Sequence, residues 1–247
     1  MRTLVLSTLL VPGLVAAPPK PQPFQVTWLG HAAFEVVSAG GTHLLIDPFL
    51  TQDPATPAAH KDLSKYKPDA ILVSHSHGDH VGDTVALAKQ SGAPVITAFE
   101  LASTFGLPDK QVWGGNVGGS FTVGDVQIHF VPAMHGSEPG GRPLGFVLSF
   151  ADGRSLYHTG DTWIFSDMAL IQELYHPQIL LLCVGGGPYT EDPATAALAV
   201  KKYFHPKVIV PMHYGTFPPL AKEADVRKAF AGDPRLKVMQ PGETATF

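Results

Sequence analysis

The sequence predicts an α/β fold in which two mixed β-sheets are covered by helices. An antiparallel strand meander opens the folded region, and a strand–helix alternation then occurs twice. Hydrophobic residues make up 45% of the chain, which is enough for a sizeable core. With 247 residues in total, the simplest interpretation is one domain that spans residues 24–247.

In the first half of the chain, β-branched and aromatic residues predict short strands. Gly40-Gly41 marks a tight turn between the second and third of them, as in an antiparallel meander. Residues 83–91 have helical spacing of apolar side chains and are followed by Gly92, a typical helix stop. The predicted strands are 24–29, 34–38, 43–46, 70–73 and 94–97, and the predicted helices are 83–91 and 100–105.

The second half contains two hairpin signals and the second strand–helix alternation. Gly124-Asp125 and Asp152-Gly153 each separate two strand-like stretches, which is typical of β-hairpins. Asp192 is a suitable N-cap for an alanine-rich helix with Pro193 at its first position. The predicted strands are 121–123, 126–131, 145–150, 155–158, 179–184, 208–210 and two short strands at the end, and the predicted helices are 167–174, 193–203 and 222–231.

Charge and cysteine content restrict the function classes. Charged residues are only 15% of the chain and the net charge is −4, so no broad basic surface is expected and a small-molecule substrate is favoured over nucleic acid. The single cysteine, Cys183, cannot form an intrachain disulfide. It lies in an apolar strand, where we expect a small buried side chain rather than a nucleophile.

The first residues resemble an export signal. Arg2 precedes an apolar run that ends in Val15-Ala16-Ala17, a pattern typical of a signal peptide over residues 1–17. Residues 18–23 form a proline-rich linker, and we expect a periplasmic or extracellular location. Proline at position 18 is unfavourable after a cleavage site, so an uncleaved membrane anchor and a cytoplasmic protein remain alternatives. No other segment is long and apolar enough to span a membrane.

One motif dominates the chemistry of the chain. His75, His77, Asp79 and His80 lie within six residues, directly after the apolar run 70–73. A metal ion stabilises such crowding because it binds neutral imidazoles. Alternate residues of a loop face different targets, so the first two histidines could hold one metal while Asp79 and His80 hold another. The alternative is a solvated polar turn after a strand.

This motif, His-x-His-x-Asp-His, resembles that of the metallo-β-lactamase superfamily. The chain is most similar to its small bacterial metal-dependent hydrolases related to L-ascorbate-6-phosphate lactonase. The resemblance implies a four-layered αββα sandwich of two mixed sheets flanked by helices. It covers nearly the whole mature chain through the segments 29–34, 45–49, 75–80, 116–119, 158–162 and 211–218.

The resemblance also implies the remaining metal ligands. His135 matches the third ligand of the first metal, Asp161 the bridging carboxylate, and His213 the last ligand of the second metal. Each of these residues follows a strand-like run, where loops of such sheets converge, and a carboxylate has two oxygens with which to bridge. The plainer alternatives are a surface histidine, a turn aspartate and a core histidine, respectively.

Several other residues are candidates for supporting roles. Asp47 resembles the family aspartate behind the ligand loop, where it would accept the second N–H of a metal-bound imidazole. His31 either faces the site or the substrate or is structural, and His158 either supports a ligand or is a satisfied buried histidine. Residues 185–187, three glycines, form either a loop that lines the site or a plain turn.

These residues predict a hydrolase with two divalent metal ions, expected to be Zn²⁺, with Mn²⁺ or Fe²⁺ as alternatives. Two metals about 3.5–4 Å apart would lower the pKa of a shared water and supply hydroxide. We expect Asp79 to combine metal binding with orienting this nucleophile. The predicted substrate is a small ester, lactone or phosphoester. A phosphodiesterase or phospholipase D-type enzyme and a non-catalytic metal-binding protein are the alternatives.

Overall fold

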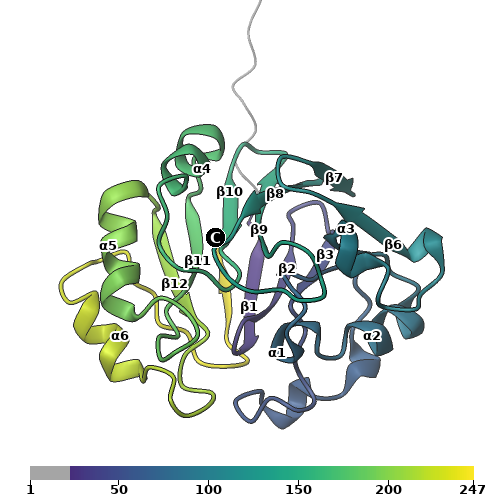
Figure 1. Ribbon diagram of the computed structural model, residues 1–247, viewed down its shortest axis with the longest axis horizontal. Helices are drawn as coiled ribbons and strands as arrows, with labels where there is room; N and C mark the ends of the chain where they lie inside the picture. Colours follow the sequence, from purple (N-terminus) through teal and green to yellow (C-terminus); the bar gives the residue numbers. More distant parts are fainter. Residues whose placement is uncertain (1–22) are drawn as a thin grey trace, which may run out of the picture.

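Two β-sheets pack face to face, with helices on both outer faces (Figure 1). The computed structural model describes residues 23–247. The two mixed sheets and flanking helices confirm the fold class expected from the sequence. Residues 1–17, and all of the linker except Pro23, lie outside the described residues, so the export signal stays a prediction.

The first sheet has seven strands in the order β13-β1-β2-β3-β4-β5-β6. Its β1, β2 and β3 form the predicted antiparallel meander, and β3 to β6 run parallel to one another. The strands are β1 (Gln25–Gly30), β2 (Ala33–Val37), β3 (His43–Ile46), β4 (Ala70–Leu72), β5 (Val95–Ala98), β6 (Val112–Gly115) and β13 (Thr244–Thr246).

The second sheet has six strands in the order β12-β11-β10-β9-β8-β7. Both predicted hairpins are present: β7 pairs with β8, and β9 pairs with β10. Strands β10, β11 and β12 run parallel to one another. The strands are β7 (Ser120–Val123), β8 (Val126–Pro132), β9 (Leu144–Phe150), β10 (Ser155–His158), β11 (Ile179–Cys183) and β12 (Val208–Met212).

Short helices cover both sheets. In Figure 1, α1, α2 and α3 lie on the side of the first sheet, whereas α4, α5 and α6 lie on the side of the second. Asp192 caps α5 by accepting the backbone N–H groups of Ala194 and Thr195, as its sequence indicates. The helices are α1 (Gly78–Val81), α2 (Thr84–Ser91), α3 (Phe99–Ala102), α4 (Met168–Tyr175), α5 (Pro193–Tyr203) and α6 (Glu223–Ala229), and single 3-10 turns occur at Ala58–His60, Leu63–Lys65 and Asp109–Gln111.

Aromatic and aliphatic side chains fill the space between the sheets. Phe24, immediately before β1, stacks on Phe150 of the second sheet with ring centroids 4.3 Å apart. Phe34, Phe130 and Phe146 are also fully buried. This continuous core fixes how the two sheets sit against each other, and therefore where the loops at their ends meet.

Strand direction places all candidate site residues at one edge of the sandwich. In the first sheet β1, β3 and β4 run the same way, and in the second sheet β8, β10 and β12 do so. The residues that follow the C-terminal ends of these strands are His31, Asp47, residues 75–80, His135, Asp161 and His213. Six chain segments thus deliver polar side chains to one place.

The structure differs from the sequence-based expectation at three elements. The two strands expected at the end are one strand, β13, because Leu236 makes only an isolated bridge with Ile209. Strand β6 and the one-turn helix α1 were not expected. Two glycines interrupt the apolar pattern of β6. The four residues of α1 are too few to show helical periodicity. Within residues 23–247, no helix combines the length and hydrophobicity needed to cross a bilayer.

Candidate metal centre

The loop after β4 carries four of the candidate ligands. Buried β4 ends at Leu72, and His75 follows as a fully buried side chain. Helix α1 then turns the chain, with the backbone N–H of His80 donating to the carbonyl of His77 at 3.1 Å. Because of this turn, His80 faces the interior while His77 stays exposed and Asp79 is half-buried.

Three imidazoles form the first cluster. The Nδ1 atom of His77 lies 3.0 Å from Nε2 of His75 and 3.3 Å from Nε2 of His135. Burial, followed by the nearby His80, holds the pKa of His75 well below its usual value, and burial also lowers the pKa of His135. These two rings are therefore neutral, the form in which imidazole binds a metal.

The second cluster combines Asp79, His80 and His213. The Nε2 atom of His213 lies 3.8 Å from Oδ2 of Asp79, and the rings of His80 and His213 stack at 5.5 Å. Asp79 faces the solvent side of this cluster, while both histidines are buried. The loops after β4 and β12, from different sheets, thus meet here.

Asp161 lies between the two clusters. Its Oδ2 is 3.0 Å from Nε2 of His213 and 3.5 Å from Nε2 of His135, and its Oδ1 is 3.3 Å from Nε2 of His80. Burial favours the neutral acid, but His213 and His80 outweigh it and hold the pKa of Asp161 well below its usual value. One ionised carboxylate therefore faces both groups of imidazoles.

Asp47 and Ser74 orient two of these rings from behind. Asp47 accepts Nδ1–H of His80 at 2.7 Å and the hydroxyl of Ser74 at 2.7 Å, and that hydroxyl lies 3.0 Å from Nδ1 of His75. Because both Nδ1 atoms are engaged, both Nε2 atoms turn toward Asp161. Ser74 was missed by the sequence reasoning, although a hydroxyl residue immediately before the motif was a usable signal.

Buried nitrogen atoms without partners indicate that the site suits a cation. Within residues 23–247, Nε2 of His80 and both ring nitrogens of His213 make no hydrogen bond of acceptable geometry, although Asp161 oxygens lie 3.0–3.3 Å from the two Nε2 atoms. Buried polar atoms are rarely left unpaired, and lone pairs that face one another repel. A divalent cation would satisfy the two Nε2 atoms, and imidazole with carboxylate oxygen is a donor set that zinc accepts. The residues present therefore fit the predicted metal ions.

His31 contacts the centre through Asp79. Its Nε2 lies 3.0 Å from Oδ2 of Asp79, and its Nδ1 lies 3.0 Å from the hydroxyl of Thr216. Burial and the nearby His213 lower the pKa of His31 to about 4, so the ring is neutral at pH 7. A carboxylate only accepts hydrogen bonds, so Nε2 carries the proton and donates to Asp79.

His158 has a different environment. Its Nε2 donates to the carbonyl of Ala32 at 3.0 Å, and its Nδ1 accepts the backbone N–H of Gly160 at 3.1 Å. Both ring nitrogens are therefore satisfied by the backbone, in line with the structural alternative. Through Gly160, the ring braces the turn that delivers Asp161.

The backbone at the site is strained. Four residues other than glycine have a positive φ in the described part of the chain, and three of them are His31, Asp47 and His213. Such conformations are unfavourable for residues with a Cβ atom and persist where the surrounding structure requires them. Three strand ends thus turn sharply to aim side chains at the same point.

The glycine run after β11 lies against the centre. A Cβ atom at Gly185 would clash with Nδ1 and with the carbonyl oxygen of His213, so only glycine fits. Cys183, two residues earlier, is buried with its sulfur 3.8 Å from Oδ1 of Asp161. Burial raises the pKa of this thiol well above its usual value, so it remains protonated. Sequence reasoning expected the burial of Cys183 but not its place beside the centre.

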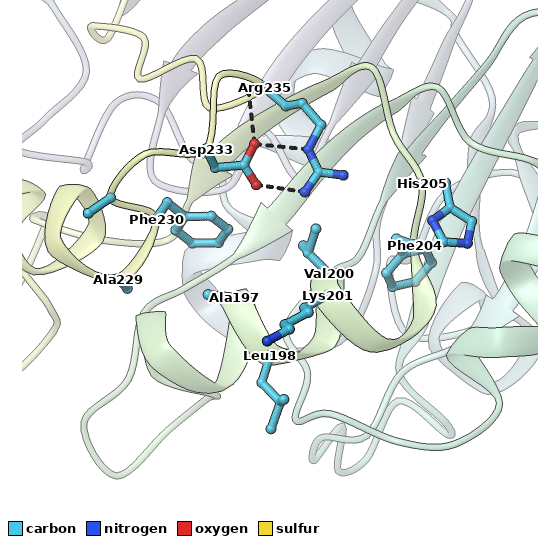
Figure 2. A pocket seen from close by; sticks show the side chains of 11 residues that line it. Ala197, Leu198, Val200, Lys201, Phe204, His205, Ala229, Phe230, Asp233 and Arg235 are labelled. Carbon is cyan, nitrogen blue, oxygen red and sulfur yellow. Dashed lines mark hydrogen bonds and ion pairs between the residues drawn. The ribbon is translucent and has the colours of Figure 1, made fainter.

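A cavity of about 310 Å³ opens onto these side chains. Its lining residues are His77, Asp79, His135, Asp161, Tyr189, His213, Phe217, Pro218 and Leu220. Figure 2 shows a larger cavity, of about 520 Å³, that lies between α5 and α6 with the Asp233–Arg235 ion pair at one side. That cavity contains none of the candidate ligands, so it is separate from the centre.

Comparison with known proteins places these features in a family context. Residues 25–213 match the model of a beta-lactamase superfamily domain. A UPF0173 metal-dependent hydrolase from Anaeromyxobacter dehalogenans is 43% identical over 240 residues, which cover 90% of this chain and 86% of that protein. Another from Archaeoglobus fulgidus is 41% identical over 236 residues, with coverages of 90% and 99%.

A solved structure agrees with these sequence matches. Igni18, a metallo hydrolase from the archaeon Ignicoccus hospitalis, superposes with a TM-score of 0.80 at 36% identity. The superposition covers 91% of this chain and 98% of Igni18. The similarity therefore extends over most of both chains.

Proposed function

Because the chain belongs to the beta-lactamase superfamily, and within it to the UPF0173 metal-dependent hydrolases, we propose that it hydrolyses a small ester, lactone or phosphoester with two divalent cations. The superfamily prediction is confirmed, and the closer relation to L-ascorbate-6-phosphate lactonase stays a prediction. The observation that carries the proposal is the position of Asp161, which faces both clusters of imidazoles.

The proposed ligands divide into two sets that share Asp161. The first cation would be held by His75, His77 and His135, and the second by Asp79, His80 and His213. Each set offers donor atoms that lie within 4.8 Å of one another. Nitrogen-rich ligation with one shared carboxylate favours zinc, and manganese or iron is the alternative.

Two bound cations lower the pKa of water and polarise a carbonyl or phosphoryl oxygen, which is the chemistry that hydrolysis needs. The protein contributes the orientation. His31 holds Oδ2 of Asp79, and because this carboxylate lines the cavity, Oδ1 can accept a proton of the attacking water. Asp47 keeps His80 in the tautomer that presents Nε2.

Metal analysis combined with an activity panel tests this proposal. The purified protein, loaded with zinc or manganese, should contain two metal ions per chain and hydrolyse at least one class among esters, lactones and phosphodiesters. His77→Ala should lose metal and reduce turnover by about 100-fold or more. His205→Ala, an exposed histidine beyond the end of α5, is the matched control and should change neither value.

Two results would overturn the proposal. If His77→Ala retained two metal ions and full turnover, the ligand assignment would be wrong. If the wild-type protein bound two metal ions tightly but turned over no substrate class, the non-catalytic metal-binding alternative would replace it.

A further inference from the structure

The cavity at the centre has two chemically distinct sides. The candidate ligands form one side, and Tyr189, Phe217, Pro218 and Leu220 form the other, which we call the apolar wall. Tyr189 is 58% exposed and Phe217 is 37% exposed, so both rings are accessible from the solvent at this cavity. No lysine or arginine from the described residues lines this cavity.

The apolar wall is held in place by its surroundings. The ring of Phe217 packs on Phe49 and His31 at centroid distances of 6.3 and 5.7 Å. The backbone N–H of Leu220 donates to the carbonyl of Phe217, which closes the segment into a turn. The next residue, Ala221, donates to the carbonyl of Gly185 at 2.8 Å, so this turn is tied to the glycine run beside the ligands.

A second cavity lies on the other side of His135, and it differs in charge. It is about 580 Å³, and Arg142 and Asp167 are among the residues that line it. Arg142 does not line the smaller cavity, which five of the candidate ligands line. Bound cations would offset the charges of Asp79 and Asp161 at the scissile bond, but a negatively charged group farther along the cavity, toward Leu220, would have no cationic side chain to pair with.

We propose that the substrate is an uncharged ester or lactone whose acyl part is apolar and lies against the apolar wall. This inference rests on the proposed function, because the carbonyl of the scissile bond must face the ligands. The acyl group of such a molecule would extend from the ligands toward Leu220 and between Phe217 and Tyr189. A volume of about 310 Å³ is at the lower end for small-molecule pockets, which favours a short chain or a single ring.

A homologous series of esters measures how much the apolar wall contributes to kcat/KM. The metal-loaded protein is assayed with p-nitrophenyl acetate, butyrate and hexanoate, which share one scissile bond. Burial of a methylene group stabilises by about 0.8 kcal/mol, so kcat/KM should rise about fourfold per methylene until the wall is covered. Phe217→Ala and Tyr189→Ala should each flatten this dependence, whereas Leu198→Ala, an exposed apolar residue on α5, should leave it unchanged.

Calorimetric binding of acetate and hexanoate to the same metal-loaded protein gives a readout that does not need turnover. Hexanoate should bind at least about tenfold more tightly than acetate, and Phe217→Ala should remove most of that difference. Esters turned over with a flat or falling chain-length dependence, or a phosphorylated sugar lactone preferred over every ester, would overturn this inference alone. No turnover of any substrate would instead overturn the proposed function, and the calorimetry would still decide whether the wall binds apolar groups.

Discussion

Glu191 should make the fold less stable as the pH rises. Its side chain is 1% exposed, and neither carboxylate oxygen finds a hydrogen-bond partner in the described part of the chain. Burial, followed by repulsion from Asp192, raises the pKa of Glu191 to about 8. At pH 7 the folded protein therefore holds this carboxyl protonated, and unfolding releases the proton.

The size of the effect follows from the two pKa values. Below pH 4.5, the pKa of Glu191 in the unfolded chain, the carboxyl is protonated in both states and its titration does not affect stability. Between pH 4.5 and about 8, each pH unit reduces the folding equilibrium constant about tenfold. The loss reaches about 3 kcal/mol at pH 7. Glu191→Gln carries an amide that does not titrate, so its free energy of unfolding should exceed that of the wild type by this amount at pH 7 and by less than about 1 kcal/mol at pH 5.

Urea denaturation followed by circular dichroism, at intervals from pH 5 to pH 8.5, measures this difference. Glu173→Gln, a substitution at an exposed glutamate on α4, is the control and should show no comparable trend. If the difference in free energy of unfolding between Glu191→Gln and the wild type stayed constant with pH, the reasoning would be refuted. The expected difference depends on pH only through titration of the Glu191 carboxyl.

Three further predictions concern the metal centre. Asp47→Asn should weaken metal affinity about 10- to 100-fold, measured by competition with a chelator, because His80 loses its carboxylate acceptor. Cys183→Ser should leave the metal content unchanged by elemental analysis, and loss of one equivalent would show that the thiol is a ligand. Gly185→Ala should displace His213 and lower the metal content to about one ion per chain, whereas retention of both ions would contradict the contact distances.

The sequence was sufficient to predict the convergence of the candidate ligands because each follows a strand. Short runs of apolar residues can be recognised in a sequence as buried strands, and strands that run in the same direction end at the same edge of a sheet. The positions of His75 and Asp161 at such ends could therefore be anticipated from the motif and the resemblance. Their approach across two sheets depends on the packing between the sheets, which no local pattern encodes.

Other parts of the site could not be predicted from local pattern. The contact between His31 and Asp79 joins residues 48 positions apart, and it depends on the positive φ of His31. Burial of Glu191 contradicts its residue type, which is normally exposed. Strand β6 pairs with β5 at the edge of the sheet, where tertiary contacts outweigh the weak strand preference of its two glycines.

The proposed ligands come from both sheets, four from the loop after β4 in the first and three from the second. Bound cations would therefore cross-link the two sheets. An intrachain disulfide could not do so, because the chain has a single cysteine. By mass action, stability would grow with the logarithm of free metal, by about 4 kcal/mol at a thousand times the dissociation constant. At low free metal the protein would then lose stability as well as activity.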